Sequence, residues 1–165
     1  MAACILLALG LAGILVWSNP TTRAWVERYL FLRFEDRDEY WFRGNGTMQD
    51  PGEIRPAYVP EGFVLMSEEM LGKNQFFIYE NDEGKEIWFY ILAGRNSGLG
   101  FDNEHSVRSE ILIDGMSGYL YTTSSDEYFN HLILFEEESG CAYYFASCVG
   151  VKELIKMAES LEYKG

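Results

Sequence analysis

Cysteine, histidine and basic side chains are all scarce in this chain of 165 residues. Its three cysteines are too few, and too unevenly spaced, to build a disulfide-stabilised scaffold. Its two histidines leave little for a zinc site or for acid–base catalysis. Only 13 lysines and arginines accompany 26 acidic residues, which gives a net charge of −13. Nucleic-acid binding is therefore excluded as a function, because neutralising phosphates requires clustered basic side chains, and the sequence has no such cluster.

Apolar and aromatic residues are plentiful by contrast. They include eleven phenylalanines, eleven tyrosines and four tryptophans, within an apolar fraction of 48%. A disordered chain would have few aromatic residues and low hydrophobicity, so this composition predicts a packed core. The length suits one domain.

Residues 2–17 are an unbroken run of apolar residues and glycine, and the first charged residue is Arg23. Sixteen helical residues extend about 24 Å, close to the ~30 Å hydrocarbon core of a bilayer. We therefore predict a transmembrane helix over residues 1–19, with Trp17 at the membrane interface. A cleaved signal peptide is the alternative, but the N-terminus lacks a basic residue and Val16-Trp17-Ser18 is a poor cleavage site.

Residues 20–55 are predicted to form a juxtamembrane helix and a linker. Pro20 suits the first position of a helix, and residues 21–34 mix apolar side chains with Arg23, Arg28 and Arg33. Residues 35–55 are polar and rich in turn formers, with one short strand candidate at residues 40–42. The positive-inside rule places the arginines in the cytoplasm, whereas the acidity of the remaining chain opposes this, so the sequence leaves both orientations open.

Residues 56–165 are predicted to form the main domain. Short strand patterns bounded by turns occur at residues 63–66, 75–80, 86–92, 107–113, 118–123, 131–137 and 141–147. Both faces of residues 86–92 are apolar, which predicts a central strand covered on both sides. Tight turns such as Asp114-Gly115 require the strands that they join to be antiparallel.

Residues 151–162 have the spacing of an amphipathic helix. The apolar side recurs at i, i+3, i+4 and i+7, and comprises Val151, Leu154, Ile155, Ala158 and Leu161. The predicted fold class is α+β: an antiparallel β-sheet with a packed C-terminal amphipathic helix, preceded by an N-terminal transmembrane helix.

Three motifs occur in order along this domain: Arg55–Phe63, Ile113–Leu120 and Glu153–Leu161, with a hairpin rich in Tyr and Phe after the first. Together they resemble the bacterial family "domain of unknown function 4367" over residues 56–162. The resemblance implies a single-pass membrane protein of Gram-positive bacteria with this domain outside the membrane, and it implies no catalytic residues. Pro60-Glu61-Gly62-Phe63 and an Ala-x-Ser sequence near the end are also distantly similar to the C-terminal domain of periplasmic sigma-factor regulators.

Two groups of side chains could carry chemistry. His131 shares its side of a strand with Ile133 and Phe135, which predicts a core or edge histidine rather than a catalytic base. Asp102, Glu104 and His105 form the one local cluster that could hold a cation. They lack both the alternating Asp/Asn pattern of a calcium loop and the ligand set of a zinc site, so we predict a solvated loop.

Three further features favour structural roles. Cys141 and Cys148 lie at opposite ends of one predicted strand, about 23 Å apart, far beyond the ~6 Å that a disulfide spans. Cys4 lies in the apolar run. We therefore predict that all three cysteines are free thiols. Residues 97–100 are rich in glycine but lack the lysine and helix of a phosphate-binding loop, which predicts a hairpin connection. The aromatic stripes predict core positions, with a few side chains lining a groove for an apolar ligand or peptide: Phe76, Phe77, Tyr79, Phe89, Tyr90, Tyr119, Tyr121, Tyr143, Tyr144 and Phe145.

Catalysis would need a nucleophile, a base and an orienting group together, and no motif in the sequence supplies them. We therefore predict no enzyme activity, catalytic residue, metal or cofactor. The predicted function is a membrane-tethered extracytoplasmic binding or sensing domain, in envelope or sigma-factor-type signalling. Its expected partners are the membrane, through the N-terminal helix, and an envelope protein or an apolar ligand, with the soluble part monomeric. The alternative is a carrier module that holds a lipid or another apolar envelope ligand.

Overall fold

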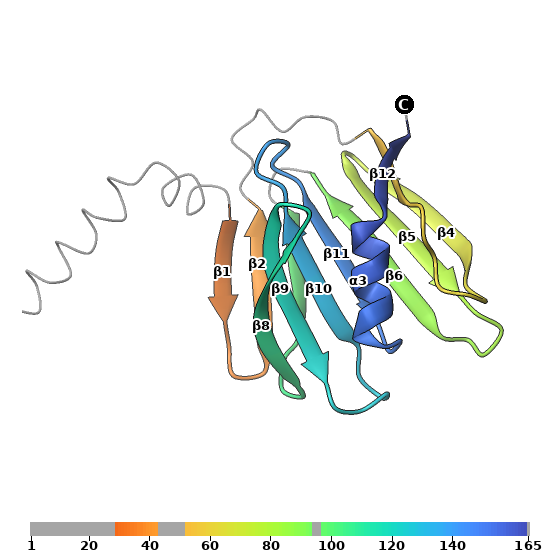
Figure 1. The fold of residues 1–165 in the computed structure, drawn as a ribbon. Coiled ribbons are helices and arrows are strands. Elements are labelled where there is room, and N and C mark those ends of the chain that lie inside the picture. The colour runs from red at the N-terminus through yellow and green to blue at the C-terminus, as the bar shows by residue number, and fades with distance from the viewer. Residues whose placement is uncertain (1–28, 43–51, 94–96, 165) are drawn as a thin grey trace, which may run out of the picture.

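The structure is a computed structural model that describes residues 29–42, 52–93 and 97–164. The predicted transmembrane helix over residues 1–19 lies outside the described residues, as do residues 20–28 of the predicted juxtamembrane helix. Figure 1 shows a large twisted β-sheet with helix α3 (Val151–Glu159) lying across its front.

Seven antiparallel strands form the large sheet, in the spatial order β4-β5-β6-β11-β10-β9-β8. Each corresponds to one of the seven predicted strand patterns, and the antiparallel prediction is confirmed for every neighbouring pair. The first strand is longer than predicted, because it continues to Leu71 instead of ending at residue 66. The strands are β4 (Val64–Leu71), β5 (Asn74–Glu80), β6 (Glu86–Leu92), β8 (Ser106–Ile113), β9 (Met116–Thr123), β10 (Asn130–Phe135) and β11 (Ala142–Ser147).

The middle of the large sheet is covered on both faces. Every residue of β10 and β11 is buried. Strand β6 lies between β5 and β11, and its residues are buried or half-buried along its whole length, which confirms the predicted interior strand. Asp114 and Gly115, between β8 and β9, have φ values of 48° and 83°. Two successive left-handed residues are what a type I′ hairpin turn requires, as the Asp-Gly pair predicts.

Helix α3 covers one face of the large sheet. It buries Leu154, Met157 and Ala158 against a core that includes Phe89 and Phe145 of β6 and β11. The helix ends earlier than predicted, at Glu159, and the chain continues as β12 (Leu161–Lys164), which pairs with β3 (Glu53–Pro56). The prediction of a helix to residue 162 is therefore wrong at its last turn, because the backbone pairing with β3 replaces it.

A second, three-stranded sheet covers the other face. It contains β1 (Tyr29–Arg33), β2 (Arg37–Phe42) and β7 (Ser97–Asp102), in the order β1-β2-β7. Tyr40, Phe42 and Phe101 of this sheet join a second core with Tyr121 and Tyr144 of the large sheet. The strands β1, β2 and β3 all begin before residue 56, at which the sequence placed the start of the main domain.

Two predictions are wrong here. Residues 29–33 lie in the segment predicted to be a juxtamembrane helix, but they form β1, an antiparallel partner of β2. Their sequence, Tyr-Leu-Phe-Leu, consists of residues that also suit strands, and pairing with β2 decides between the two structures. Residues 97–100 were predicted to be a hairpin connection, but they lie in β7, which pairs with β2.

The predicted α+β fold class with its N-terminal transmembrane helix is corrected by these findings. The described residues are mostly β-strand, and their one α-helix is nine residues long. No helix in the described ranges is long and apolar enough to span a bilayer.

Candidate functional site

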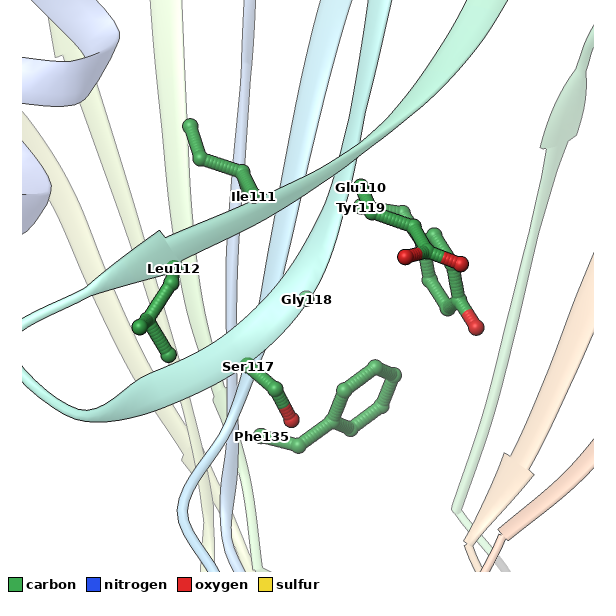
Figure 2. A pocket seen from close by; sticks show the side chains of 7 residues that line it. All are labelled: Glu110, Ile111, Leu112, Ser117, Gly118, Tyr119 and Phe135. Atoms are coloured by element: carbon green, nitrogen blue, oxygen red, sulfur yellow. The ribbon is translucent and has the colours of Figure 1, made fainter.

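A groove lies beside β8, β9 and β10, on the face of the large sheet that carries the second core (Figure 2). Its volume is about 470 Å³. Its lining combines two aromatic rings, aliphatic side chains, one hydroxyl and one carboxylate: Glu110, Ile111, Leu112, Ser117, Gly118, Tyr119 and Phe135. The aromatic rings form the part nearest to the core, since Tyr119 and Phe135 both contact the ring of Tyr40 on β2, with centroids 6.1 and 5.9 Å away.

The alternation of β8 and β9 places four of the lining side chains on one face. Glu110 pairs with Tyr119 across the two strands, and Leu112 pairs with Ser117. Directly opposed residues of an antiparallel pair project to the same side of the sheet. The carboxylate, the leucine, the hydroxyl and the tyrosine ring therefore border one hollow, which Figure 2 shows.

Gly118 holds β9 close to β10 at this point. A Cβ atom built on Gly118 would lie 2.0 Å from the carbonyl oxygen of Ile133 and 3.0 Å from the Cα atom of Leu134. Both are backbone atoms, so they cannot rotate away as a side chain can. Only glycine allows this spacing of the two strands at the groove.

Arg108 lies on the same face of β8 as Glu110, next to the groove. Its guanidinium carbon lies 4.6 Å from the centroid of the Tyr119 ring and 4.8 Å from that of Phe31. Burial works against its charge, but the hydroxyls of Tyr121 and Tyr40 outweigh that effect and raise the pKa of Arg108. Within the described residues, the buried Nη1 atom of this guanidinium has no hydrogen-bond partner.

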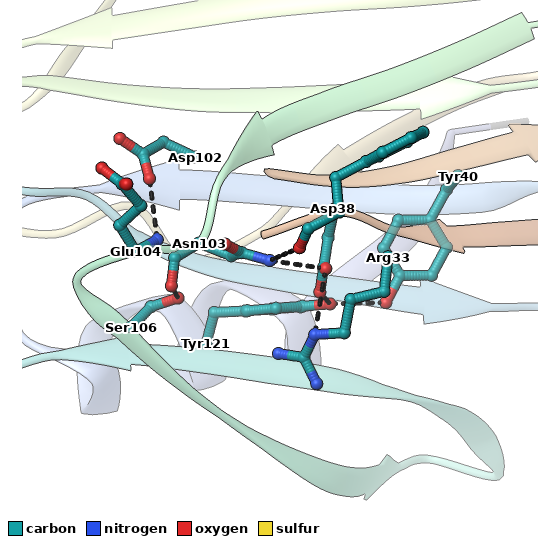
Figure 3. A network of polar contacts seen from close by, with 9 residues as sticks. Arg33, Asp38, Tyr40, Asp102, Asn103, Glu104, Ser106 and Tyr121 are labelled. Carbon is teal, nitrogen blue, oxygen red and sulfur yellow. Dashed lines mark hydrogen bonds and ion pairs between the residues drawn. The ribbon is translucent and has the colours of Figure 1, made fainter. Parts of the chain in front are cut away.

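A polar network joins the two sheets deeper in the second core (Figure 3). The carboxylate of Asp38 is fully buried and accepts hydrogen bonds from the Tyr121 hydroxyl, at 2.6 Å, and from Asn103 Nδ2, at 2.7 Å. Arg33 Nε lies 3.3 Å from the same carboxylate. The hydroxyls of Tyr40 and Tyr121 are 2.7 Å apart and share a further hydrogen bond.

The electrostatics of this network keep its tyrosines protonated. Burial raises the pKa of Tyr40 to about 12, because the ionised phenolate would lose its hydration. Burial, followed by the hydrogen bond to Asp38, raises the pKa of Tyr121 as well. These hydroxyls can donate hydrogen bonds at neutral pH but cannot act as bases. The network therefore fastens β2 and β7 to β9, and its chemistry is structural.

His131 is a core histidine, as its position on the strand predicts. It is buried, its Nδ1 atom lies 2.8 Å from the Tyr144 hydroxyl, and its ring stacks on Phe101 with centroids 4.4 Å apart. Burial lowers the pKa of His131 to about 4, so the ring is neutral at pH 7.

The acidic cluster before β8 forms a turn. The Asp102 carboxylate accepts a hydrogen bond of 2.8 Å from the backbone N–H of Glu104, and the His105 ring packs 4.1 Å from the ring of Tyr128. Among the residues that the structure describes, no three His, Cys, Asp or Glu side chains are grouped so that they could hold a metal ion.

Cys141 and Cys148 form no disulfide with each other, in agreement with the separation expected along one strand; Cys141 is buried and Cys148 half-buried. Cys4 lies outside the described residues. Seven of the ten residues in the predicted aromatic stripes are buried, whereas Phe76, Tyr90 and Tyr119 are half-buried. Of these three, Tyr119 lines the groove.

Sequence reasoning missed the other lining residues. Leu112 was the available signal, because it occupies the side of β8 that carries Arg108 and Glu110, where a polar residue would be expected on a solvent-exposed face.

The comparisons with known proteins give one match. The family model described as "Domain of unknown function (DUF4367)" matches residues 53–161. Neither the curated proteins nor the solved structures contain a match to the chain. The predicted family resemblance is thus confirmed, whereas the comparisons do not show the similarity to periplasmic sigma-factor regulators. Because the matched region runs from β3 to the first residue of β12 and includes the whole large sheet and α3, this chain belongs to the family named domain of unknown function (DUF4367).

Proposed function

We propose that this protein is a binding domain whose groove recognises an apolar ligand that is neutral or positively charged. The observation that carries the proposal is the lining of the groove, in which the rings of Tyr119 and Phe135 lie beside the single carboxylate of Glu110. Ligand pockets typically combine such an apolar surface with a few polar groups, in volumes of roughly 300–1,000 Å³. The volume of about 470 Å³ falls within that range.

Charge limits the class of ligand. The neighbouring cation, Arg108, is half-buried, and its guanidinium packs on the rings of Tyr119 and Phe31. Glu110 is exposed at the groove, and the chain as a whole has a net charge of −13. An anionic head group would be repelled by both, whereas an amine or a hydrogen-bond donor could pair with the carboxylate. The favoured ligand is therefore an apolar group next to a cationic or neutral donor, as in an aliphatic amine.

The second candidate function is a carrier that holds an apolar ligand. The open form of the groove favours a recognition domain over such a carrier. Glu110, Leu112 and Ser117 are all exposed, and Leu112 retains 71% of its accessible surface. A carrier must shield an apolar ligand from water on every side, whereas a sensing domain need only distinguish bound from unbound states. The buried groups His131 and Asp38 make structural contacts, so no catalytic role is proposed for them.

The proposed location is the outer face of the cell membrane, in a signalling role. Support for it comes from the sequence, in which the apolar run of residues 2–17 favours membrane attachment. Fractionation of cells that express the full chain, followed by protease treatment of intact cells, tests this location. Recovery in the membrane fraction with cleavage from outside is expected, and a protease-resistant protein would contradict it.

The binding proposal is tested with Nile red, a neutral apolar dye, added to the full-length protein. We expect saturable fluorescence enhancement, and displacement of the dye by dodecylamine at about five- to tenfold lower concentration than by dodecanoate, since a near-surface ion pair is worth about 1 kcal/mol. Glu110→Gln should abolish this preference for the amine. Glu138→Gln, at an exposed position between β10 and β11, is the control and should preserve it.

A matched pair of leucine variants locates the site. Leu112 and Leu71 both expose 71% of their surface, and they lie on opposite edge strands of the large sheet. Leu112→Asp should weaken dye binding at least tenfold, whereas Leu71→Asp should leave it unchanged. Equal effects of the two variants, or no saturable binding, would refute the groove as the binding site.

A further inference from the structure

Strand β4 is the edge of the large sheet farthest from the groove, and it exposes an unusual amount of apolar surface. Within the described residues it pairs only with β5. Five of its eight residues are large apolar side chains that expose 44% to 71% of their surface: Val64, Leu65, Met66, Met70 and Leu71.

An edge strand presents unpaired N–H and C=O groups that can pair with another strand, and proteins usually blunt such edges. A register shift between Leu65 and Ser67 interrupts β4 near its start. From Ser67 to Leu71 the pairing with β5 is regular, so these five residues offer an uninterrupted edge. The exposed Met70 and Leu71 lie at its end, beside the open backbone.

The charges along this edge have one sign. Glu68 and Glu69 are both exposed in the middle of the regular segment. The nearest arginine, Arg55, is already engaged, because its Nη2 atom lies 2.6 Å from Glu68 and 3.7 Å from Glu53, and its guanidinium packs over the Phe77 ring at 4.0 Å. A strand that docks here would therefore meet a surplus of carboxylates.

We propose that the edge of β4, over Ser67–Leu71, docks an extended segment of a partner protein that carries alternating apolar and basic residues, and that this segment adds an eighth strand to the sheet. Its backbone would pair with β4. Because side chains alternate along a strand, its basic side chains would lie on the face of Glu69 and pair with that carboxylate, and its apolar side chains would lie on the other face and cover Met70. This surface is distinct from the groove, and the inference does not depend on the proposed ligand.

A second copy of this chain is disfavoured as the occupant. Symmetric antiparallel pairing of two copies over Ser67–Leu71 would place Glu69 directly opposite Glu69, because Glu69 is the central residue of the segment. Like charges directly opposite each other destabilise a strand pair, and the net charge of −13 on each chain adds to the repulsion.

The test uses the full-length protein and a fluorescent ten-residue peptide of alternating valine and lysine. We expect binding that weakens with added salt, together with slower hydrogen–deuterium exchange of the amides of residues 67–71. Two control peptides, one with a proline in its centre and one with glutamates in place of the lysines, should not bind. Glu69→Lys should weaken binding of the lysine peptide about five- to tenfold, since it replaces an attractive cross-strand pair by a repulsive one.

Glu138→Lys, at an exposed position between β10 and β11, is the matched control and should change the affinity less than twofold. The proposal is overturned if the lysine peptide does not bind, if Glu69→Lys binds it as tightly as the wild type, or if protection appears at residues 106–113 instead. Dimerisation of the protein that Glu69→Gln strengthens, by removing the repulsion between the two copies of Glu69, would assign the edge to a second copy, which also overturns the proposal.

Discussion

The buried network around Asp38 makes a strong prediction about the hydroxyl of Tyr121. That hydroxyl donates to the Asp38 carboxylate at 2.6 Å and shares a hydrogen bond of 2.7 Å with Tyr40. Tyr121→Phe removes both bonds without opening a cavity, since only one oxygen atom is lost. Because a hydrogen bond to a charged group contributes about 1.5–3 kcal/mol, and Asp38 keeps Asn103 and Arg33 as partners, we expect the free energy of unfolding to fall by about 3 kcal/mol.

Urea denaturation at pH 7, followed by tryptophan fluorescence, measures this change. Tyr163→Phe is the matched control, because Tyr163 is 64% exposed and its hydroxyl also bonds to a carboxylate, that of Glu136. This substitution should lower the free energy of unfolding by less than about 0.5 kcal/mol. A double-mutant cycle with Asp38→Asn should give a coupling energy of about 1–2 kcal/mol. If Tyr121→Phe costs no more than Tyr163→Phe, or the cycle shows no coupling, the two sheets are not joined as described.

Three further tests probe other parts of the structure by urea denaturation. Leu154→Ala, in the buried side of α3, should cost about 2–5 kcal/mol, whereas exposed Lys152→Ala should cost roughly 0.5 kcal/mol or less; equal costs would show that the helix does not pack on the sheet. Gly118→Ala should destabilise the protein by about 3 kcal/mol, because its Cβ would meet the β10 backbone, and an unchanged midpoint would contradict that contact. Burial lowers the pKa of His131 from 6.5 to about 4, so the unfolded state takes up a proton before the folded state does as the pH falls. The stability is therefore retained above pH 6.5, and the free energy of unfolding should fall by about 2 kcal/mol between pH 7 and pH 5. His131→Gln should flatten this dependence and exposed His105→Gln should not, and an identical pH profile for both variants would contradict it.

The strands of the large sheet could be predicted because their signals are local. Residues 86–92 are apolar on both faces, and the Asp114-Gly115 pair supports a type I′ turn. The second sheet could not be predicted in the same way, because β2 pairs with β7 across a long stretch of chain. Nothing within either short segment specifies that partner.

Glycine in β7 shows the same limit. Gly98 suggested a loop, but in the structure it lies under the ring of Trp41, and a Cβ atom there would come within 3.1 Å of that ring. Glycine is needed at this position because the Trp41 side chain approaches closely from β2, a strand that is adjacent in the sheet but far away in the sequence. Likewise, the groove depends on Tyr119 and Phe135 meeting Tyr40 across the second core, a contact that no sequence spacing shows.

The central claim is that the groove beside β8 and β9 binds an apolar amine, and paramagnetic NMR tests it most directly. Spin-labelled dodecylamine is added to the full-length protein with isotope-labelled leucine methyl groups, and the broadening of each signal reports its distance from the bound probe. We expect selective broadening of Leu112, in the groove, while Leu71, equally exposed on the far edge strand, stays sharp. Equal broadening of Leu112 and Leu71, or broadening of Leu71 alone, would contradict the claim.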